Sequence, residues 1–571
     1  MATPAVAIPW ARRIDAGLIS IALLLGTLVF LVLYPVVLVL FNSFNVSPMG
    51  SPPQLGLNEW REAFSNPGIF QSIVNTFKVA FTRQAISFPL AIFLAWLLAR
   101  TDIPLRGWLE FMFWLSFFMP TLSVTIGWMI LLDPQAGMVN QLLTLLPFVE
   151  RGPFNIYSFW GIVWTHLMAN TIAVKVMLLA PAFRRMDAAL EEASRMSGGT
   201  TIGTMLRVTV PMMTPTLVVV FVLAIIRSLE SFEIELLLGP PIGFWVYSTK
   251  ILELVRVEPP LYGQAAALGT IVLLSLLLLI PVQRWLSTRR QYTTLTGQFK
   301  SALIDLGRWK FPAFTFVSLV TFLLTVVPFV TTLVGSFMVR FGFFDLPKVW
   351  TLEHWKLALG DTLFLGSLAN TLWMAMGAAF LATALFPIIA YFSVRTSLPG
   401  RAALDFISWL PWAIPGMLLG LGLLWVFLGT PILRPLYGTI YILILATVIN
   451  SMTLGTQIIK GGLLQIGKDL EDASRMVGGS WWATYVRIVL PLMMPTLILV
   501  GVMNFISAAR DVTTIVLLAT AETKTLALLT LDFVSEGLRE AAAVMAVVIA
   551  LLTSGVALAA RVLGLQVGIR N

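Results

Sequence analysis

The sequence predicts an all-α polytopic membrane protein with about 12 transmembrane helices in two parallel six-helix repeats. Three observations predict this fold: an apolar composition, long runs without charged residues, and short motifs that each occur twice. Of the 571 residues, 58% are hydrophobic and 11% are charged, and the mean hydropathy is +0.90. A soluble domain carries about 25% charged residues, so the composition excludes a water-soluble fold, a disordered chain and a fibrous repeat.

The residue types that most often bind metals or carry out catalysis are scarce. The chain has no cysteine and two histidines, which excludes disulfides, thiolate metal sites and cysteine nucleophiles. We therefore assign no catalytic residue, no metal site and no cofactor to this chain.

Runs without Asp, Glu, Lys or Arg locate the membrane spans, because about 20 apolar residues are needed to cross the hydrocarbon core. Eleven such runs occur, and a twelfth span is expected near Ser72–Ala99, which contains Lys78 and Arg83. The eleven runs are Ala16–Leu40, Phe111–Leu132, Gly152–Val174, Val208–Ile226, Pro259–Gln283, Phe311–Val339, Thr362–Val394, Phe406–Leu433, Pro435–Ile459, Ile488–Ala509 and Ala541–Ala560.

The distribution of Lys and Arg predicts the orientation, because short cytoplasmic loops are enriched in both. With the N-terminus inside, the loops and termini on that side carry 22 Lys and Arg, and the loops on the other side carry ten. Both termini are therefore expected in the cytoplasm. The net charge of +9 then reflects topology in a lipid bilayer and indicates no nucleic-acid partner.

Short motifs recur at a nearly constant spacing, which predicts a duplicated six-helix unit. Ser72-Ile-Val-Asn-Thr76 recurs 295 residues later as Ser367-Leu-Ala-Asn-Thr371, and Asn170 recurs 280 residues later as Asn450. The difference of 15 residues falls in an outer loop of the first half. An even number of spans separates the copies, so both halves have the same direction. The expected domains are a first half at 1–283, a basic cytoplasmic linker at 284–310 and a second half at 311–571.

The most specific motif lies in a cytoplasmic loop of each half, at 181–211 and 460–491. The first copy reads Glu192-Ala-Ser-Arg-Met-Ser-Gly198, then nine residues, then Val208-Thr-Val-Pro211. The second copy reads Asp472-Ala-Ser-Arg-Met-Val-Gly478, then nine residues, then Ile488-Val-Leu-Pro491.

These residue types predict a two-helix element with a sharp bend. A carboxylate stabilises the first turn of a short helix, a glycine permits the positive φ of a helix end, and a proline suits the start of the next helix. We expect the bend at Gly198 and Gly478, where any side chain would be strained. Gly199 and Gly479 should tolerate alanine better.

The pattern resembles the EAA loop (E-A-A-x3-G-x9-I-x-L-P) of permease subunits of bacterial ABC importers. Two copies on one chain resemble the fused permeases of the ferric-iron subgroup. Ser194 and Ser474 replace the second Ala of the pattern. The resemblance implies a type I ABC importer permease fold, in a bacterial inner membrane.

The resemblance also implies partners. Two separate ATP-binding cassette subunits, which carry ATP and magnesium, would dock on the two loops, and a periplasmic or extracellular binding protein would deliver the substrate. The residues that the resemblance assigns to ATPase coupling are Glu192, Ala193, Gly198, Pro211, Asp472, Ala473, Gly478 and Pro491.

The best match to a phosphate-binding loop on the chain itself is weak. Gly462-Leu-Leu-Gln-Ile-Gly467-Lys468 is followed by Asp469, where Ser or Thr should hold magnesium. It also follows a membrane helix, where the motif requires a strand. We therefore expect no enzymatic activity on this chain and ATP hydrolysis on a separate subunit.

Charged residues at the outer end of one span in each half are candidates for the substrate pathway, because ionisable groups in the membrane are costly and mark function. They are Glu230 and Glu233 in the first half and Arg510 and Asp511 in the second, where Arg510 aligns with Glu230. If the halves face each other, Glu230 and Arg510 are expected to pair at an outer gate. The alternative is that all four groups end their helices at the outer interface and are only solvated.

The acidic excess in the first half favours a cationic substrate, and the resemblance makes ferric iron the expected one. Lys78 and Arg83 would equally suit an anion. Polyamine, thiamine, sulfate or phosphonate cargo on the same machinery is therefore the first alternative. A 12-span secondary transporter is the second, and the glycine-hinged loop in both halves argues against it.

Overall fold

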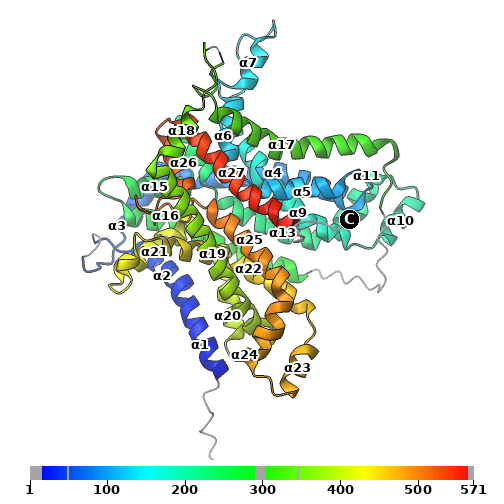
Figure 1. Cartoon of the computed structure of the whole chain (residues 1–571), viewed down its shortest axis with the longest axis vertical. Coiled ribbons are helices and arrows are strands. Elements are labelled where there is room, and N and C mark those ends of the chain that lie inside the picture. Colours follow the sequence, from blue (N-terminus) through cyan, green and yellow to red (C-terminus); the bar gives the residue numbers. More distant parts are fainter. Residues whose placement is uncertain (1–15, 48–50, 290–302, 345, 563–571) are drawn as a thin grey trace, which may run out of the picture.

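The computed structural model describes all residues except 1–15, 48–50, 290–302, 345 and 563–571, and it describes the side chains of the helix at 262–289 as far as Leu278. The described residues are mostly helical (Figure 1). Up to residue 289, the α-helices are α1 (Ala16–Leu28), α2 (Tyr34–Asn42), α3 (Asn58–Ser65), α4 (Pro67–Arg100), α5 (Arg106–Phe118), α6 (Thr121–Leu132), α7 (Met138–Thr144), α8 (Phe159–His166), α9 (Ile172–Arg184), α10 (Ala189–Met196), α11 (Thr201–Thr204), α12 (Val210–Met212), α13 (Thr214–Leu229), α14 (Glu233–Leu238), α15 (Tyr247–Arg256) and α16 (Tyr262–Arg289).

The remaining α-helices, from residue 310 onward, follow a similar order. They are α17 (Lys310–Ser336), α18 (Glu353–Gly360), α19 (Thr362–Arg395), α20 (Arg401–Trp409), α21 (Gly416–Gly429), α22 (Ile440–Gln465), α23 (Asp469–Met476), α24 (Trp481–Thr484), α25 (Leu490–Ala509), α26 (Leu526–Ser535) and α27 (Arg539–Val562). Short π-helical turns join some of them, at η1 (Val29–Leu33), η2 (Leu167–Thr171), η3 (Met205–Thr209) and η8 (Tyr485–Val489), and 3-10 turns lie at η4 (Pro240–Ile242), η5 (Gly307–Trp309), η6 (Leu410–Ala413) and η7 (Arg434–Leu436).

Within the described residues, eight helices are long and apolar enough to cross a membrane, or up to 11 if each of three bent helix pairs counts as one span. The sequence predicted about 12. The remaining predicted span, Pro259–Gln283, falls on α16, which counts as a shorter apolar helix because the part with described side chains ends at Leu278. The polytopic all-α prediction is therefore confirmed, with a lower count of straight spans.

Three spans that were predicted to be continuous are broken: Val208–Ile226 contains a bend of 75° before α13, and two others are bent more sharply. Phe111–Leu132 is divided into α5 and α6, which meet at 98°, and Phe406–Leu433 contains the break of 113° before α21. The residue before a proline avoids helical backbone angles. Met119 (φ −67°, ψ 137°) and Ile414 (φ −99°, ψ 115°) are accordingly extended, and each helix restarts after the following proline.

The first span of each half packs against the other half. α17 contacts α5 and α6, and α2 contacts α21. A glycine makes each approach possible: a Cβ atom on Gly127 would lie 2.4 Å from the backbone oxygen of Pro328, and one on Gly422 would lie 2.7 Å from that of Pro35. Gly127 and Gly422 are 295 residues apart, so the same backbone contact occurs twice. The domain limits at 283 and 311 remain predictions.

The described end of the predicted linker is held on the first half. The backbone N–H of Ile304 donates to the carbonyl of Arg100 (2.8 Å), and Lys310 pairs with Asp102 (2.8 Å). Partial burial raises the pKa of Asp102, but hydrogen bonds from Lys310 and the backbone of Leu306 outweigh it and hold that pKa below its usual value. Most of the linker, 290–302, lies outside the described residues, as do both predicted cytoplasmic termini.

Candidate functional site

The two EAA segments, defined here as residues 189–204 and 469–484, have the same local structure. They lie at two separate tips of the molecule, where α10 and α11 form the right-hand end and α23 and α24 the lower end of Figure 1. In each, a short helix ends in a glycine with φ +85°, Gly198 or Gly478. The bend predicted at these two glycines is present.

Backbone hydrogen bonds show why a glycine is needed there. The N–H of Gly199 donates to the carbonyl of Ser194 (2.9 Å), and that of Gly198 donates to the carbonyl of Arg195 (3.0 Å). Gly479 and Gly478 make the same two bonds to Ser474 and Arg475, with the same lengths. This is the Schellman arrangement, which requires a left-handed residue after the helix.

The expectation that Gly199 and Gly479 tolerate alanine better is wrong. A Cβ atom on either would lie 2.7 Å from a backbone oxygen, that of Ser194 or of Ser474. By contrast, no atom lies within 4 Å of a Cβ on Gly198 or Gly478. Gly198 and Gly478 are therefore required by their backbone angle alone. Gly199 and Gly479 are required because a Cβ atom there would be too close to a backbone oxygen.

The serines that depart from the EAA pattern have a structural role. The Ser194 and Thr204 hydroxyls are hydrogen bonded at 2.9 Å, and the Ser474 and Thr484 hydroxyls at 2.8 Å. Each bond ties the two short helices of its segment together across the bend. An alanine at 194 or 474, as in the usual pattern, could not form it.

A buried carboxylate anchors each EAA segment to the membrane helices. Glu191 accepts hydrogen bonds from Arg100 Nε (3.0 Å) and from the Thr209 hydroxyl (2.7 Å). Arg100 is the last residue of α4 and is 2% exposed. The second half repeats the arrangement: Glu471 pairs with Arg395, the last residue of α19 (3.2 Å), and accepts from the Tyr391 hydroxyl (2.6 Å).

Sequence reasoning missed this anchor because it selected the acidic residue one position later. The predicted residues Ala193, Gly198, Pro211, Asp472, Ala473, Gly478 and Pro491 are exposed, and Glu192 is partly exposed. The exposed tips also carry apolar side chains, among them Met196 at 89% and Val477 at 86%. The recurrence of Arg100 as Arg395 and of Glu191 as Glu471 was the available signal.

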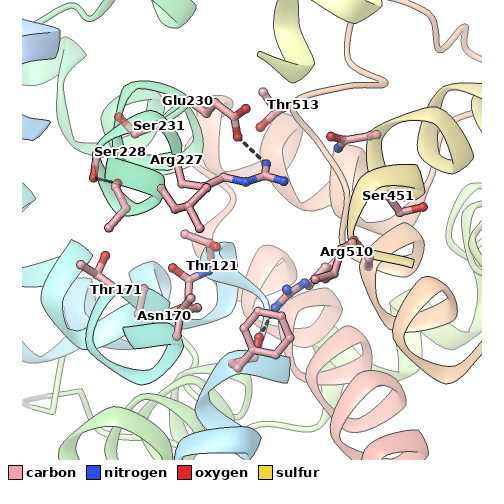
Figure 2. Close-up of a pocket in the computed structure, with 18 of the residues that line it drawn as sticks. Thr121, Asn170, Thr171, Arg227, Ser228, Glu230, Ser231, Ser451, Arg510 and Thr513 are labelled. Carbon is pink, nitrogen blue, oxygen red and sulfur yellow. Dashed lines mark hydrogen bonds and ion pairs between the residues drawn. The ribbon is translucent and has the colours of Figure 1, made fainter. Parts of the chain in front are cut away.

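A cavity of about 370 Å³ lies between the two halves. Residues of both halves line it, including three of the four predicted pathway residues, Glu230, Glu233 and Arg510. Figure 2 shows Arg227 and Glu230 on one wall, Asn170 and Thr171 on a second, and Arg510 and Ser451 on a third. The fourth predicted residue, Asp511, does not line the cavity. Its carboxylate accepts hydrogen bonds from the Thr514 N–H (3.0 Å) and from Asn450 (3.4 Å).

The predicted pair between Glu230 and Arg510 does not form. Glu230 pairs instead with Arg227, three residues before it (2.5 Å), whose guanidinium also lies over the Trp412 ring at 4.1 Å. Arg510 donates to the backbone carbonyls of Phe117 and Met119, the latter at 3.1 Å. The i,i+3 neighbour is available to Glu230 within its own chain segment, and the break before α6 leaves carbonyls free to accept from Arg510.

The charged lining of the cavity comes mainly from the first half. Arg83, Lys175, Arg227, Glu230 and Glu233 line it, with His166 between them. The Nδ1 atom of His166 lies 2.6 Å from Arg83, and Nε2 lies 2.7 Å from Glu235. The repeat relates each of these residues to one in the second half: Arg83 to Ala378, Lys175 to Gly455, Arg227 to Ser507, Glu230 to Arg510, Glu233 to Thr513 and His166 to Ala446.

The part of the chain that the structure describes contains no group of three or more His, Asp or Glu side chains arranged to hold a metal ion. The cavity lining presents charged side chains and hydrogen-bond donors from both halves.

Comparison with known proteins identifies a known family domain in the second half of the chain. Residues 384–565 match the family described as binding-protein-dependent transport system inner membrane component. The chain therefore contains an ABC transporter permease domain over these residues. The matched segment of this permease contains the second EAA segment with its bend at Gly478.

Named relatives of the permease come from several transport systems. A putative ferric transport system permease of Haemophilus influenzae is 29% identical over 65% of this chain and 58% of its own length. A ferric transport system permease of Actinobacillus pleuropneumoniae is 29% identical over 73% of this chain and 60% of its own length. A sulfate transport system permease of Salmonella typhimurium is 24% identical over 40% of this chain and 79% of its own length.

The permease thus spans about 60% of the length of the two ferric relatives. Among solved structures, it is similar to the bacterial alginate ABC transporter in complex with an alginate pentasaccharide-bound periplasmic protein. The identity is 21% and the TM-score 0.42, over 48% of this chain and 96% of that chain.

Proposed function

We propose that this permease forms the transmembrane pathway of an ATP-driven importer and couples that pathway to separate ATP-binding subunits. The observation that carries the proposal is the pair of EAA segments. The same glycine turn, with φ +85°, stands at the exposed tip of each half, and a buried Glu–Arg pair ties each segment to the end of a long membrane helix, α4 or α19.

This arrangement is suited to transmitting a displacement. The EAA segment is a compact unit, because the Schellman turn and the serine–threonine bond fix its two short helices. Its buried carboxylate is fixed to α4 or α19, and residues of α4 such as Arg83 line the cavity. A force applied to the exposed tip would reach the cavity through packed helices.

The partners proposed are two ATP-binding cassette subunits, one on each EAA segment, and an extracytoplasmic substrate-binding protein on the opposite face. The family description, which names binding-protein-dependent transport, supports the second partner. Both termini are proposed to be cytoplasmic, on the side of the EAA segments, in a bacterial inner membrane. The chain itself is proposed to be non-enzymatic, with ATP and magnesium on the partner subunits.

Ferric iron is the first proposed substrate, supported by the ferric transport names of the two relatives described above. A sulfate-type anion is the second candidate. It is favoured by the sulfate permease relative and by the four cationic side chains, against two carboxylates, that line the cavity.

Uptake into proteoliposomes that contain the permease and its ATPase, with the substrate-binding protein added on the opposite side of the membrane from the EAA segments, tests the proposal. Uptake of radiolabelled iron or sulfate should require ATP on the side of the membrane where the EAA segments lie. It should continue when ionophores collapse the ion gradients. Uptake that stops with the ionophores and needs no ATP would make the chain a secondary transporter and contradict the proposal.

A further inference from the structure

One cation in the cavity wall has no counter-charge. Lys175 of α9 lines the cavity and is 2% exposed. Its ammonium donates to the Ser87 hydroxyl (2.9 Å) and to the Thr171 carbonyl (2.8 Å), which are both neutral acceptors. Among the described residues, no carboxylate lies within ion-pair distance of it. An ammonium has three donors, so one remains for a further acceptor.

A second buried lysine, by contrast, has a carboxylate partner. Lys460 of α22, on the corresponding helix of the second half, is 7% exposed and pairs with Asp405. It does not line the cavity. A buried charge without a partner is costly, and within a membrane span an ionisable group of this kind indicates a functional site.

Arg83 supplies a second incompletely satisfied cation on the same wall. Its side chain is buried, donates to His166 and to the Arg227 carbonyl (3.4 Å), and its Nε has no hydrogen-bond partner. Glu235 interacts with Arg83 electrostatically but does not line the cavity, and its Oε1 atom is held by His166 and by the Ser231 hydroxyl (2.6 Å). Both carboxylates that face the cavity belong to other groups: Glu230 is paired with Arg227, and Glu233 lies near Arg510.

We propose that Lys175 and Arg83 form a subsite for a small oxyanion on the cavity wall of the first half. An oxyanion there would accept the third Lys175 hydrogen bond and neutralise its charge. The adjacent cavity wall carries Asn170 and Thr171 (Figure 2), an amide and a hydroxyl that suit an oxygen-rich ligand. The second half has Ala378 and Gly455 at the related positions, so the subsite is one-sided.

The role of this subsite in transport rests on the proposed function. Anion binding at the subsite does not rest on it. The oxyanion is either the cargo itself or an anionic group that accompanies a metal cargo. Both sources present the same chemistry to Lys175.

Direct binding to the purified permease in nanodiscs, without ATPase or binding protein, tests the subsite. Radiolabelled sulfate should bind saturably at one site per chain and be displaced by phosphate. Lys175→Met should weaken binding roughly 10- to 100-fold, the effect of losing a charged hydrogen bond, and Lys175→Arg should restore most of it. Lys460→Met is the matched control and should bind as wild type does, since Asp405 is half exposed and remains solvated.

Two results would overturn the subsite: no saturable sulfate or phosphate binding by the wild-type permease, or equal binding by the Lys175→Met variant. A cooperative thermal unfolding transition, measured for each variant alongside binding, shows that the variant is folded. In reconstituted vesicles, sulfate uptake identifies the anion as cargo, and iron uptake that requires the anion identifies it as a companion. Binding without any ATP-driven uptake would contradict the proposed function and leave the subsite standing.

Discussion

Replacing Gly478 tests whether the EAA segment acts through its backbone geometry. Gly478 has φ +85°, and a Cβ atom there would meet no atom within 4 Å. Gly478→Ala therefore changes the backbone preference without introducing a clash. We expect the variant to insert and fold normally, and to bind the ATP-binding subunit more weakly, because the docking proposed above uses the bent form of the segment.

The size of the effect follows from the backbone term alone. A residue with a Cβ atom in the left-handed conformation costs about 1–2 kcal/mol, which corresponds to roughly a 5- to 30-fold weaker association. Gly478→Asn should lose less, because asparagine tolerates this conformation better than alanine does. The same change at Gly198 should have a similar effect, and effects at two such separate sites should multiply.

Titration of the ATP-binding subunit onto nanodisc-embedded permease measures these affinities. Two variants serve as controls. Gly461→Ala lies in the helix α22 with no atom within 4 Å of its Cβ, so it should bind as wild type does. Gly479→Ala should weaken binding more than Gly478→Ala, because its Cβ atom would lie 2.7 Å from the Ser474 backbone oxygen.

Two results would refute this reasoning. If Gly478→Ala and wild type bind equally, the bend is not needed for docking. If Gly478→Asn is as weak as Gly478→Ala, positive φ is not the cause of the loss.

Two further predictions concern orientation and the cavity. Because the chain has no cysteine, Leu145→Cys and Met196→Cys each introduce a single thiol, at positions that are 79% and 89% exposed. An impermeant maleimide should label Cys at 145 in intact cells and Cys at 196 only in broken cells. Labelling of both positions in intact cells would contradict the proposed topology. In thermal unfolding, Glu230→Gln and Arg227→Gln should be non-additive by about 0.5–3 kcal/mol, whereas Glu230→Gln and Arg510→Gln should add to within about 0.5 kcal/mol; the reverse pattern would restore the pair predicted from the sequence.

Local features of the EAA segments were predictable from the sequence. A positive φ at Gly198 and Gly478 follows from the chemistry of a helix end, which involves only neighbouring residues. The role of Gly199 and Gly479 was predicted wrongly, because it depends on a carbonyl five residues earlier whose position follows from the turn itself. The anchor at Glu191 was missed because its partner, Arg100, is 91 residues away.

The residues of the cavity were also predicted only in part from the sequence. The alignment of the halves related Glu230 to Arg510, and both line the cavity together with Glu233, whereas Asp511 does not. It could not show which charges pair, since Arg227 competes for Glu230 and the broken α5–α6 backbone competes for Arg510. The two most sharply broken spans, which contain Pro120 and Pro415, were predicted to be continuous; the angles of 98° and 113° accompany contacts with α17 and α2, which are distant in sequence.

We propose that this permease is driven by ATP-binding subunits docked on its two EAA segments. Native mass spectrometry of the transporter purified from membranes tests it most directly. One permease chain should be found with two ATP-binding subunits, and the Gly198→Val/Gly478→Val variant should lose both while it remains inserted and folded. A permease that purifies alone and still transports its cargo, or a double variant that keeps both subunits, would contradict it.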